Sequence, residues 1–263
     1  MKTMGLKRSL TAIAAGVGLA LAAAPVAAQT EKPQYGGKLE IGTVYVTLSA
    51  LSWDMADWNW KQNHDMGQMY ETLFAADLSK SKRLGGKHPF IADAWLPTDA
   101  IRGELAERWS WKENPLRLEV HLRKGVMFPA KPGVMAAREL TAEDVVFSFN
   151  RLEKSPKKIP NYFDHVTKVE ALDKHTVQFT FKDFFSEWDY RFGWGYYSGI
   201  MPKEVADAGA GNWKNVNGTG PFLLADFVQG NSNTYAKNPG YWGRERIGGE
   251  EYRLPFVDRV VYR

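Results

Sequence analysis

Two adjacent carboxylates are the residues of this chain that are best placed to do chemistry. Residues 141–149 read TAEDVVFSF, and Glu143 and Asp144 stand just before an apolar run. Paired acids can serve as a general acid and a general base, as a glycosidase or another hydrolase requires. The same residues can also open a helix. The choice between these interpretations decides whether an enzyme is expected.

The neighbours of the pair favour the helix. With Thr141 as the N-cap, Asp144 falls at the third helical position and completes a capping box, while Leu140 and Val145 occupy the positions of a hydrophobic staple. Acids in a first turn also interact favourably with the helix dipole. We therefore assign Thr141 and Asp144 a structural role and expect no catalytic residue. A hydrolase that uses Glu143 and Asp144 stays as the alternative.

No other spacing in the sequence indicates a catalytic or metal centre. The five histidines show neither the HxxxH nor the HExxH spacing of zinc sites. The sequence has no GxSxG and no P-loop, and Gly218 and Gly220 give only half of a dinucleotide fingerprint before Pro221. We expect no metal and no cofactor. We interpret Gly218, Gly220 and Pro221 as a structural turn that lets two backbones approach closely.

The elements that position these residues are predicted to be mixed, with strands in the majority. Residues 116–122 alternate between apolar and polar side chains, which predicts a half-buried strand. Residues 176–181 alternate too, and a turn at Asp173 and Lys174 predicts a hairpin with residues 166–171. The remaining expected elements are helices at residues 64–74 and after Thr141, and strands at residues 38–46, 221–227 and 256–263. The fold class is therefore mixed α/β.

The first 28 residues differ from the rest. Lys2, Lys7 and Arg8 precede an almost wholly small and apolar stretch over residues 10–28. This pattern predicts a cleavable secretory signal peptide that ends before Gln29, followed by a polar leader over residues 29–36. A transmembrane anchor is the alternative, and Pro25 disfavours it. An exported chain without cysteine suits the bacterial periplasm.

The charge excludes one class of partner. The chain has 34 basic and 30 acidic residues, and the three cations of the predicted signal peptide account for most of the difference, so residues 29–263 carry a net charge of +1. A nucleic-acid-binding domain presents a dense basic face, so no nucleic-acid partner is expected. The absence of cysteine excludes disulfides and cysteine ligands, and a chain of this length can bury a core without them.

Eight segments in order resemble one protein family. They read YGGKLEIGT, MYETLF, ELAERWSW, LRLEVHLRKGVMF, LTAEDVVFSFNRL, VTKVEALDKHTVQFTF, NGTGPFLL and NPGYWG. In this order, behind a predicted signal peptide, they resemble the extracellular solute-binding proteins of family 5, the receptors of peptide, nickel and related ABC importers. One departure is a turn before the TAEDV segment that is expanded over residues 129–139. A larger one is length, because members of the family are much longer.

The resemblance implies a periplasmic-binding-protein type II-like fold. Residues 37–52 and 185–263 are expected to form the core of the first lobe, and residues 53–184 an inserted subdomain of it. The second lobe is expected to be absent, so the chain is interpreted as truncated and is expected to bind ligand weakly alone. The implied function is a periplasmic substrate-binding protein that delivers peptides to an ABC permease. The implied protein is a monomer, and an oligosaccharide or glycoside ligand stays open.

Two loops could supply side chains for a ligand. A binding wall is concave and largely apolar with a few polar groups, and aromatic residues suit both peptide side chains and sugar rings. The predicted ligand-binding residues are Trp53, Asp54, Trp194, Tyr196, Tyr197 and Ser198. The alternative for each aromatic residue is packing in the core. A third interpretation of the chain is a structural or interaction module without a ligand.

Overall fold

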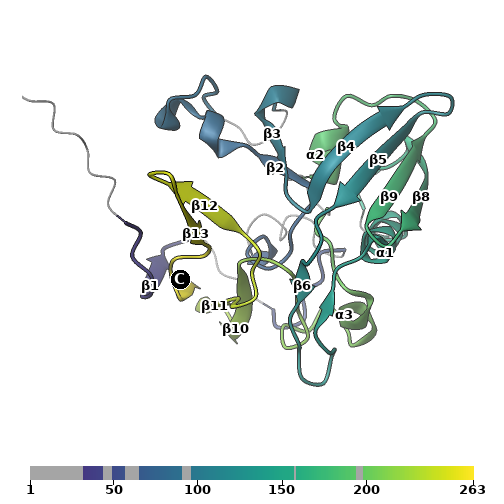
Figure 1. The fold of residues 1–263 in the computed structure, drawn as a ribbon. Helices are drawn as coiled ribbons and strands as arrows, with labels where there is room; N and C mark the ends of the chain where they lie inside the picture. Colours follow the sequence, from purple (N-terminus) through teal and green to yellow (C-terminus); the bar gives the residue numbers. More distant parts are fainter. Residues whose placement is uncertain (1–31, 44–48, 57–64, 91–95, 157, 194–197) are drawn as a thin grey trace, which may run out of the picture. The chain divides into compact units, whose positions relative to one another are not determined.

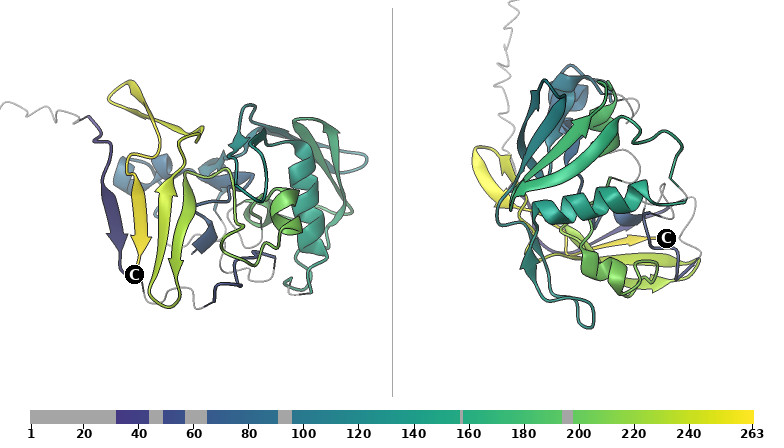
Figure 2. Two further views of the ribbon diagram at one scale, coloured as in Figure 1. Left: turned by 90° about the horizontal axis from the view of Figure 1, so that it is seen from below. Right: turned by 90° about the vertical axis from the view of Figure 1, so that its right-hand side faces the viewer.

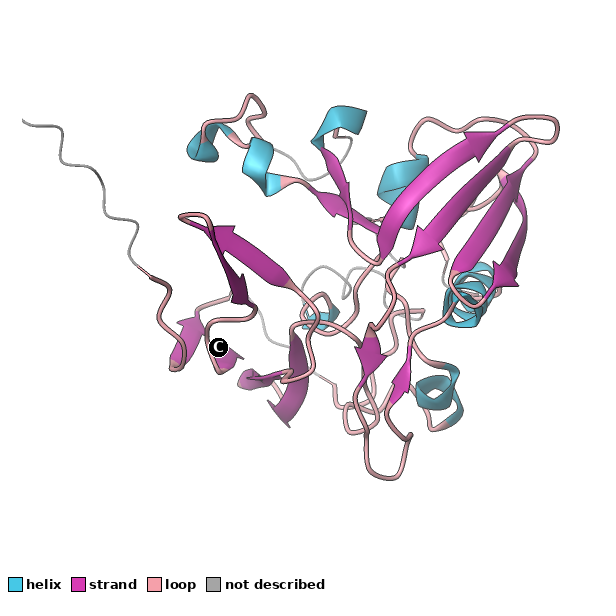
Figure 3. Cartoon of the chain, in the orientation of Figure 1, coloured by secondary structure: helices cyan, strands magenta, loops and turns pink. Residues whose placement is uncertain are grey.

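The computed structural model describes residues 32–43, 49–56, 65–90, 96–156, 158–193 and 198–263, and residues 32–263 form one unit (Figure 1). Strands are more numerous than helices in this part of the chain (Figure 3). No helix among these residues is long and apolar enough to cross a bilayer.

One four-stranded sheet joins the start of the described chain to its end. Its order is β1 (Lys38–Ile41), β14 (Arg259–Tyr262), β11 (Ser232–Lys237) and β10 (Phe222–Val228), with β1 parallel to β14 and the other pairs antiparallel (Figure 2). The fully buried Tyr235 lies in the core cluster beneath it. The strands predicted near residues 221–227 and 256–263 are confirmed.

The second four-stranded sheet is wholly antiparallel. Its order is β4 (Ala106–Lys112), β5 (Arg117–Leu122), β9 (Thr176–Phe181) and β8 (Val166–Asp173). Leu118, Val120 and Leu122 of β5 are buried while their neighbours are partly exposed, as the alternation predicted. The β8–β9 hairpin is also confirmed. Asp173 stabilises its turn by accepting a hydrogen bond from the backbone N–H of His175 at 2.8 Å.

Helix α1 (Ala142–Glu153) packs against β8 and β9 (Figure 2). Val145, Phe149 and Leu152 are at most 3% exposed, so the predicted apolar face is the buried one. Phe149 meets the ring of Phe179 edge to face, with centroids 4.9 Å apart. Thr141 is the N-cap, and the carboxylate of Asp144 accepts a hydrogen bond from its backbone N–H at 2.9 Å. The helix therefore begins where its capping residues require.

The remaining elements are short. They are β2 (Phe74–Ala76) with β3 (Ile101–Gly103), β6 (Met127–Phe128) with β7 (Arg138–Glu139), β12 (Arg244–Ile247) with β13 (Glu250–Arg253), the helices α2 (Trp188–Phe192) and α3 (Lys203–Asp207), and the 3-10 turns η2 (Leu78–Lys80), η3 (Lys82–Leu84) and η4 (Thr98–Ala100).

The helix predicted over residues 64–74 is wrong in its described part. A single turn forms, in which the N–H groups of Met69 and Tyr70 donate to the carbonyl of Met66, and the chain then extends into β2. The carbonyl of Glu71 accepts from Ile200 and that of Leu73 from Glu104 and Ala106. These distant partners replace helical hydrogen bonds, so tertiary contacts override the local spacing. The apolar residues of the segment are nevertheless all buried.

The turn at residues 217–221 passes close to this segment. The N–H of Gly220 donates to the carbonyl of Met69 at 2.7 Å. A Cβ atom added to Gly218 would lie 2.2 Å from that same carbonyl oxygen, and one added to Gly220 would lie 2.7 Å from it. Both positions therefore have room for glycine only.

Candidate functional site

The three predicted ligand-binding residues that the structure describes are buried. Trp53 is fully buried and meets the ring of Phe227 edge to face at 5.5 Å. Asp54 is 7% exposed, and Ser198, also fully buried, donates its hydroxyl hydrogen to the carbonyl of Arg191. Trp194, Tyr196 and Tyr197 lie outside the described residues. The role of all six as ligand contacts stays a prediction.

Asp54 is tied to helix α1 by a two-pronged ion pair. Arg151 Nη1 donates to Asp54 Oδ1 at 2.7 Å, and Arg151 Nη2 donates to Asp54 Oδ2. The two residues are 97 positions apart in the chain. Such a fork fixes the guanidinium plane against the carboxylate plane. The loop before residue 57 is therefore anchored to the helix.

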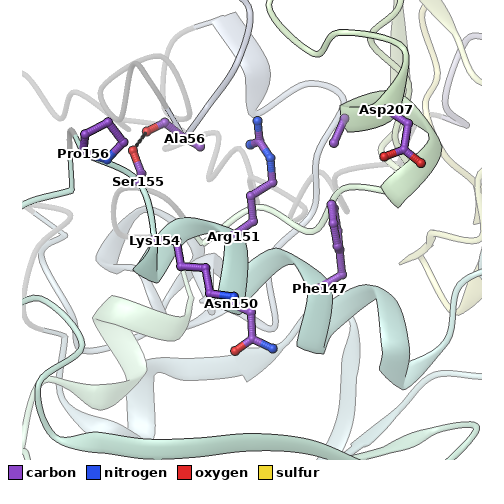
Figure 4. Close-up of a pocket in the computed structure, with 9 residues that line it drawn as sticks. Ala56, Phe147, Asn150, Arg151, Lys154, Ser155, Pro156 and Asp207 are labelled. Atoms are coloured by element: carbon purple, nitrogen blue, oxygen red, sulfur yellow. Dashed lines mark hydrogen bonds between the residues drawn. The ribbon is translucent and has the colours of Figure 1, made fainter.

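A hollow of about 510 Å³ opens beside this pair (Figure 4). It lies between the second half of α1 and α3, and its lining comes from Ala56, Phe147, Asn150, Arg151, Lys154, Ser155, Pro156, Ala206 and Asp207. Ser155 closes one side by donating its hydroxyl hydrogen to the carbonyl of Ala56 at 2.6 Å. Phe147 offers an apolar surface, and Asn150 and Lys154 offer polar groups. This combination can hold a small polar ligand.

A second hollow of about 520 Å³ lies at the other end of the helix, where Glu143 and Asp144 sit. Arg138 spans it, with bonds to both oxygens of Asp144 at 2.9 and 2.7 Å and to both oxygens of Glu204 at 2.7 and 2.8 Å. Asp144 also accepts from the backbone of Thr141. Its oxygens are thus engaged in holding β7, α1 and α3 together.

Sequence reasoning missed a buried acid at Glu71. This residue is 3% exposed, and both of its carboxylate oxygens lie 3.0 Å from Trp242 Nε1, which donates to them. The hydroxyl of Tyr241 donates to Oε1 at 3.3 Å. The only sequence signal was an acid inside the apolar run MYETLF, flanked by residues that are themselves buried.

A second carboxylate, Glu104, faces Glu71. It accepts from the backbone N–H and the hydroxyl of Thr72 at 2.7 and 2.8 Å. Arg123 lies near, but it donates to the carbonyl of Glu104 at 2.6 Å and stacks over Trp242 at 4.7 Å. Burial, followed by the charge of Glu104, raises the pKa of Glu71 to about 8, and burial also raises the pKa of Glu104. The pair therefore holds a proton at neutral pH.

These acids do not form a metal centre. Across the described residues, no group of three or more histidine or acidic side chains is arranged to hold a metal ion. The cluster links the segment at residues 71–72 to the turn before β12.

Comparison with known proteins gives one consistent family. Residues 100–263 match the model described as bacterial extracellular solute-binding proteins, family 5 Middle. The dipeptide-binding protein of Escherichia coli (strain K12) is 32% identical over 188 residues, which are 63% of this chain and 32% of that protein. The di/tripeptide-binding protein 3 of Pseudomonas aeruginosa (strain UCBPP-PA14) is 30% identical over 54% of this chain and 30% of its own length.

A solved structure extends the match to most of the chain. The ABC transporter-associated periplasmic binding protein DppA from Helicobacter pylori, in complex with the peptide STSA, aligns with a TM-score of 0.62 and 25% identity. The alignment covers 88% of this chain and 43% of that one. The chain thus spans about a third of the length of the two curated relatives. Its mixed α/β architecture is part of a lobe of the periplasmic-binding-protein type II fold.

Proposed function

The chain belongs to family 5 of the bacterial extracellular solute-binding proteins, and from this premise we propose that it is a periplasmic receptor that binds peptides and delivers them to an ABC permease. The observation that carries the proposal is the family match over residues 100–263 together with relatives named for peptides. The basic and apolar start of the chain, typical of a signal peptide, supports the location.

The proposed role is binding without covalent chemistry. Members of this family are transport proteins. In the acid pair of Glu143 and Asp144, both carboxylate oxygens of Asp144 accept hydrogen bonds from Arg138. A receptor of this kind acts by holding its ligand between hinged parts and presenting the closed form to a permease. The ligand shifts the equilibrium by its higher affinity for the closed state.

We place the ligand-facing surface at the hollow beside the Asp54–Arg151 pair. Asp54 is among the predicted ligand residues, and its ion pair orients Arg151, which lines the hollow. Asn150 and Lys154 offer a hydrogen-bonding amide and a positive charge, to which the carboxylate of a peptide is complementary. Trp53 and Ser198 are buried, so in this proposal they pack behind the hollow and do not contact the ligand.

Ligand-detected NMR tests the function, because it registers weak binding. The chain is mixed with the tetrapeptide STSA, with a set of dipeptides and, separately, with maltotriose. We expect saturable binding of peptides, no binding of the sugar and no cleavage products. Binding of the sugar alone, or release of hydrolysis products, contradicts the proposal.

A matched pair of variants tests the place of binding. Lys154→Ser removes an exposed cation from the hollow, and Lys182→Ser removes one from the loop after β9. We expect peptide affinity to fall about fivefold or more for the first variant and to stay unchanged for the second. Equal affinities would move the site elsewhere on the chain and leave the peptide-binding function standing.

A further inference from the structure

The loop that follows β2 is folded on itself and points its side chains outward. Over residues 77–90, the N–H of Lys82 donates to the carbonyl of His88 at 2.9 Å, and the N–H of His88 donates to the carbonyl of Lys80 at 3.0 Å. Gly85 takes the left-handed conformation at φ 85° and ends η3. We call residues 77–90 the basic loop; it is the blue segment between β2 and β3 (Figure 1).

The basic loop concentrates positive charge. Residues 77–90 contain four cations, Lys80, Lys82, Arg83 and Lys87, and one acid, Asp77, whereas residues 29–263 together carry a net charge of +1. The loop therefore carries +3 and the rest of residues 29–263 carries −2. Lys80 is 3.6 Å from Asp77. Within the described part of the chain, the other three cations make no ion pair, and all three are exposed.

Two large apolar side chains stand among these cations. Leu78 is 61% exposed and Leu84 is 69% exposed. Exposed leucine costs free energy in water, and that cost is relieved when the side chain enters an apolar phase. Unpaired cations beside exposed leucines are typical of surfaces that lie in the headgroup boundary of an anionic bilayer, where lysine stems run along the apolar region and the charges meet phosphate.

We propose that the basic loop is a membrane-contact element that rests on an anionic lipid surface, with Leu78 and Leu84 entering the headgroup boundary. An acidic protein surface would also attract the cations, but it gives the two protruding leucines no apolar phase to enter. The contact is on a different part of the chain from the hollow beside Asp54 and does not depend on which ligand is bound. It would hold a receptor near the bilayer that contains its permease.

The test measures co-sedimentation with lipid vesicles. Since residues 32–263 form a unit of their own, the chain is used from Gln29 onward, so that the basic and apolar residues 1–28 do not bind vesicles themselves. We expect binding to vesicles of equimolar phosphatidylcholine and phosphatidylglycerol, no binding to phosphatidylcholine alone, and weakening with added salt.

Two variants of the loop separate charge from apolar contact. The triple variant K82S/R83S/K87S is expected to lose about 100-fold in affinity, at about fivefold per cation. The double variant L78S/L84S keeps every charge and is expected to lose at least about tenfold in affinity. All five side chains are exposed, so both variants are expected to melt at the temperature of the unchanged chain by circular dichroism.

A charge-matched control removes three exposed lysines elsewhere. K112S/K124S/K182S makes the same change in net charge outside the loop and is expected to keep its affinity within about twofold. The proposal is overturned if this control loses as much affinity as the triple loop variant, or if the chain binds neutral vesicles as well as anionic ones. It is also overturned if both loop variants bind with the affinity of the unchanged chain. Failure to bind vesicles together with loop-dependent binding to polyglutamate would assign the loop to an acidic protein partner and overturn it as well.

Discussion

The acids around helix α1 and the acids beside β2 and β3 are satisfied in different ways. Near the helix, Asp54 and Asp144 each face a guanidinium, from Arg151 and Arg138. Near β2, the hydrogen bonds that Glu71 accepts among the described residues come from the neutral groups of Tyr241 and Trp242, and the charge of another acid, Glu104, raises its pKa. In the described part of the chain, neither Glu71 nor Glu104 takes part in an ion pair.

The difference separates fixed contacts from contacts that depend on pH. A carboxylate that accepts two hydrogen bonds from one arginine is held in one plane and defines an angle between elements. A carboxylate buried among neutral donors and facing another acid takes up a proton instead. The second region is therefore expected to weaken as the proton leaves. The following substitutions test this contrast.

Arg138→Ala is expected to have the largest effect. It leaves Asp144, whose side chain is 5% exposed, without its cation, and breaking such a pair costs about 3 to 5 kcal/mol of the free energy of unfolding. Urea denaturation monitored by tryptophan fluorescence measures the change. Lys203→Ala is the control, because its pair with Asp207 is more than half exposed on both sides and is worth about 0.5 kcal/mol or less.

Glu71→Gln is expected to change how stability varies with pH. The pKa of Glu71 is about 8 in the folded chain against 4.5 ordinarily, so between these values the folded state binds more protons than the unfolded state. The free energy of unfolding therefore falls as pH rises through this window, by about 1.4 kcal/mol per pH unit at most. Glutamine keeps an oxygen for Trp242 and carries no proton to lose, so the variant's profile is expected to be flatter.

The measurement is urea denaturation at several pH values inside that window. Glu143→Gln is the matched control, because Glu143 is exposed in the first turn of α1, and it is expected to leave the profile as it is. Parallel profiles for the Glu71 variant and the unchanged chain would show that Glu71 keeps its charge at neutral pH, which would remove the contrast between the two regions.

Thr141→Ala is expected to have the smallest effect of the three. Loss of an N-cap side chain costs about 1 kcal/mol. Asp144 keeps its bonds to Arg138 in this variant, so the ion-pair network stays intact. A loss as large as that of Arg138→Ala would mean that the cap, and not the arginine, holds this end of the helix. Thermal unfolding followed by circular dichroism is sufficient to compare the two variants.

The parts of the fold that sequence reasoning predicted are those with local causes. The start of α1 follows from residues three positions apart, and the burial of Leu118, Val120 and Leu122 follows from the period of a strand. The failed helix before β2 has the opposite origin. Its carbonyl groups accept hydrogen bonds from residues about 30 to 150 positions away, and no local pattern records those partners.

The candidate site was predictable to a smaller degree. Asp54 stood out as a polar residue beside Trp53, but its partner Arg151 lies 97 positions later. Glu71 and Trp242 are 171 positions apart. Charge pairing and proton uptake depend on which distant side chains meet, and a single sequence gives only their identities. The family resemblance supplied the function because it rests on the order of many segments, each weak alone.

The parallel pairing of β1 with β14 has a consequence for the order in which the chain folds. Lys38 aligns with Arg259, so this contact closes a loop of more than 200 residues, whereas the sheet of β4, β5, β9 and β8 is complete within residues 106–181. Closing the longer loop costs more conformational entropy and cannot precede synthesis of β14. We therefore expect the antiparallel sheet to assemble before β1 pairs with β14, so that β1 is a late strand of the fold.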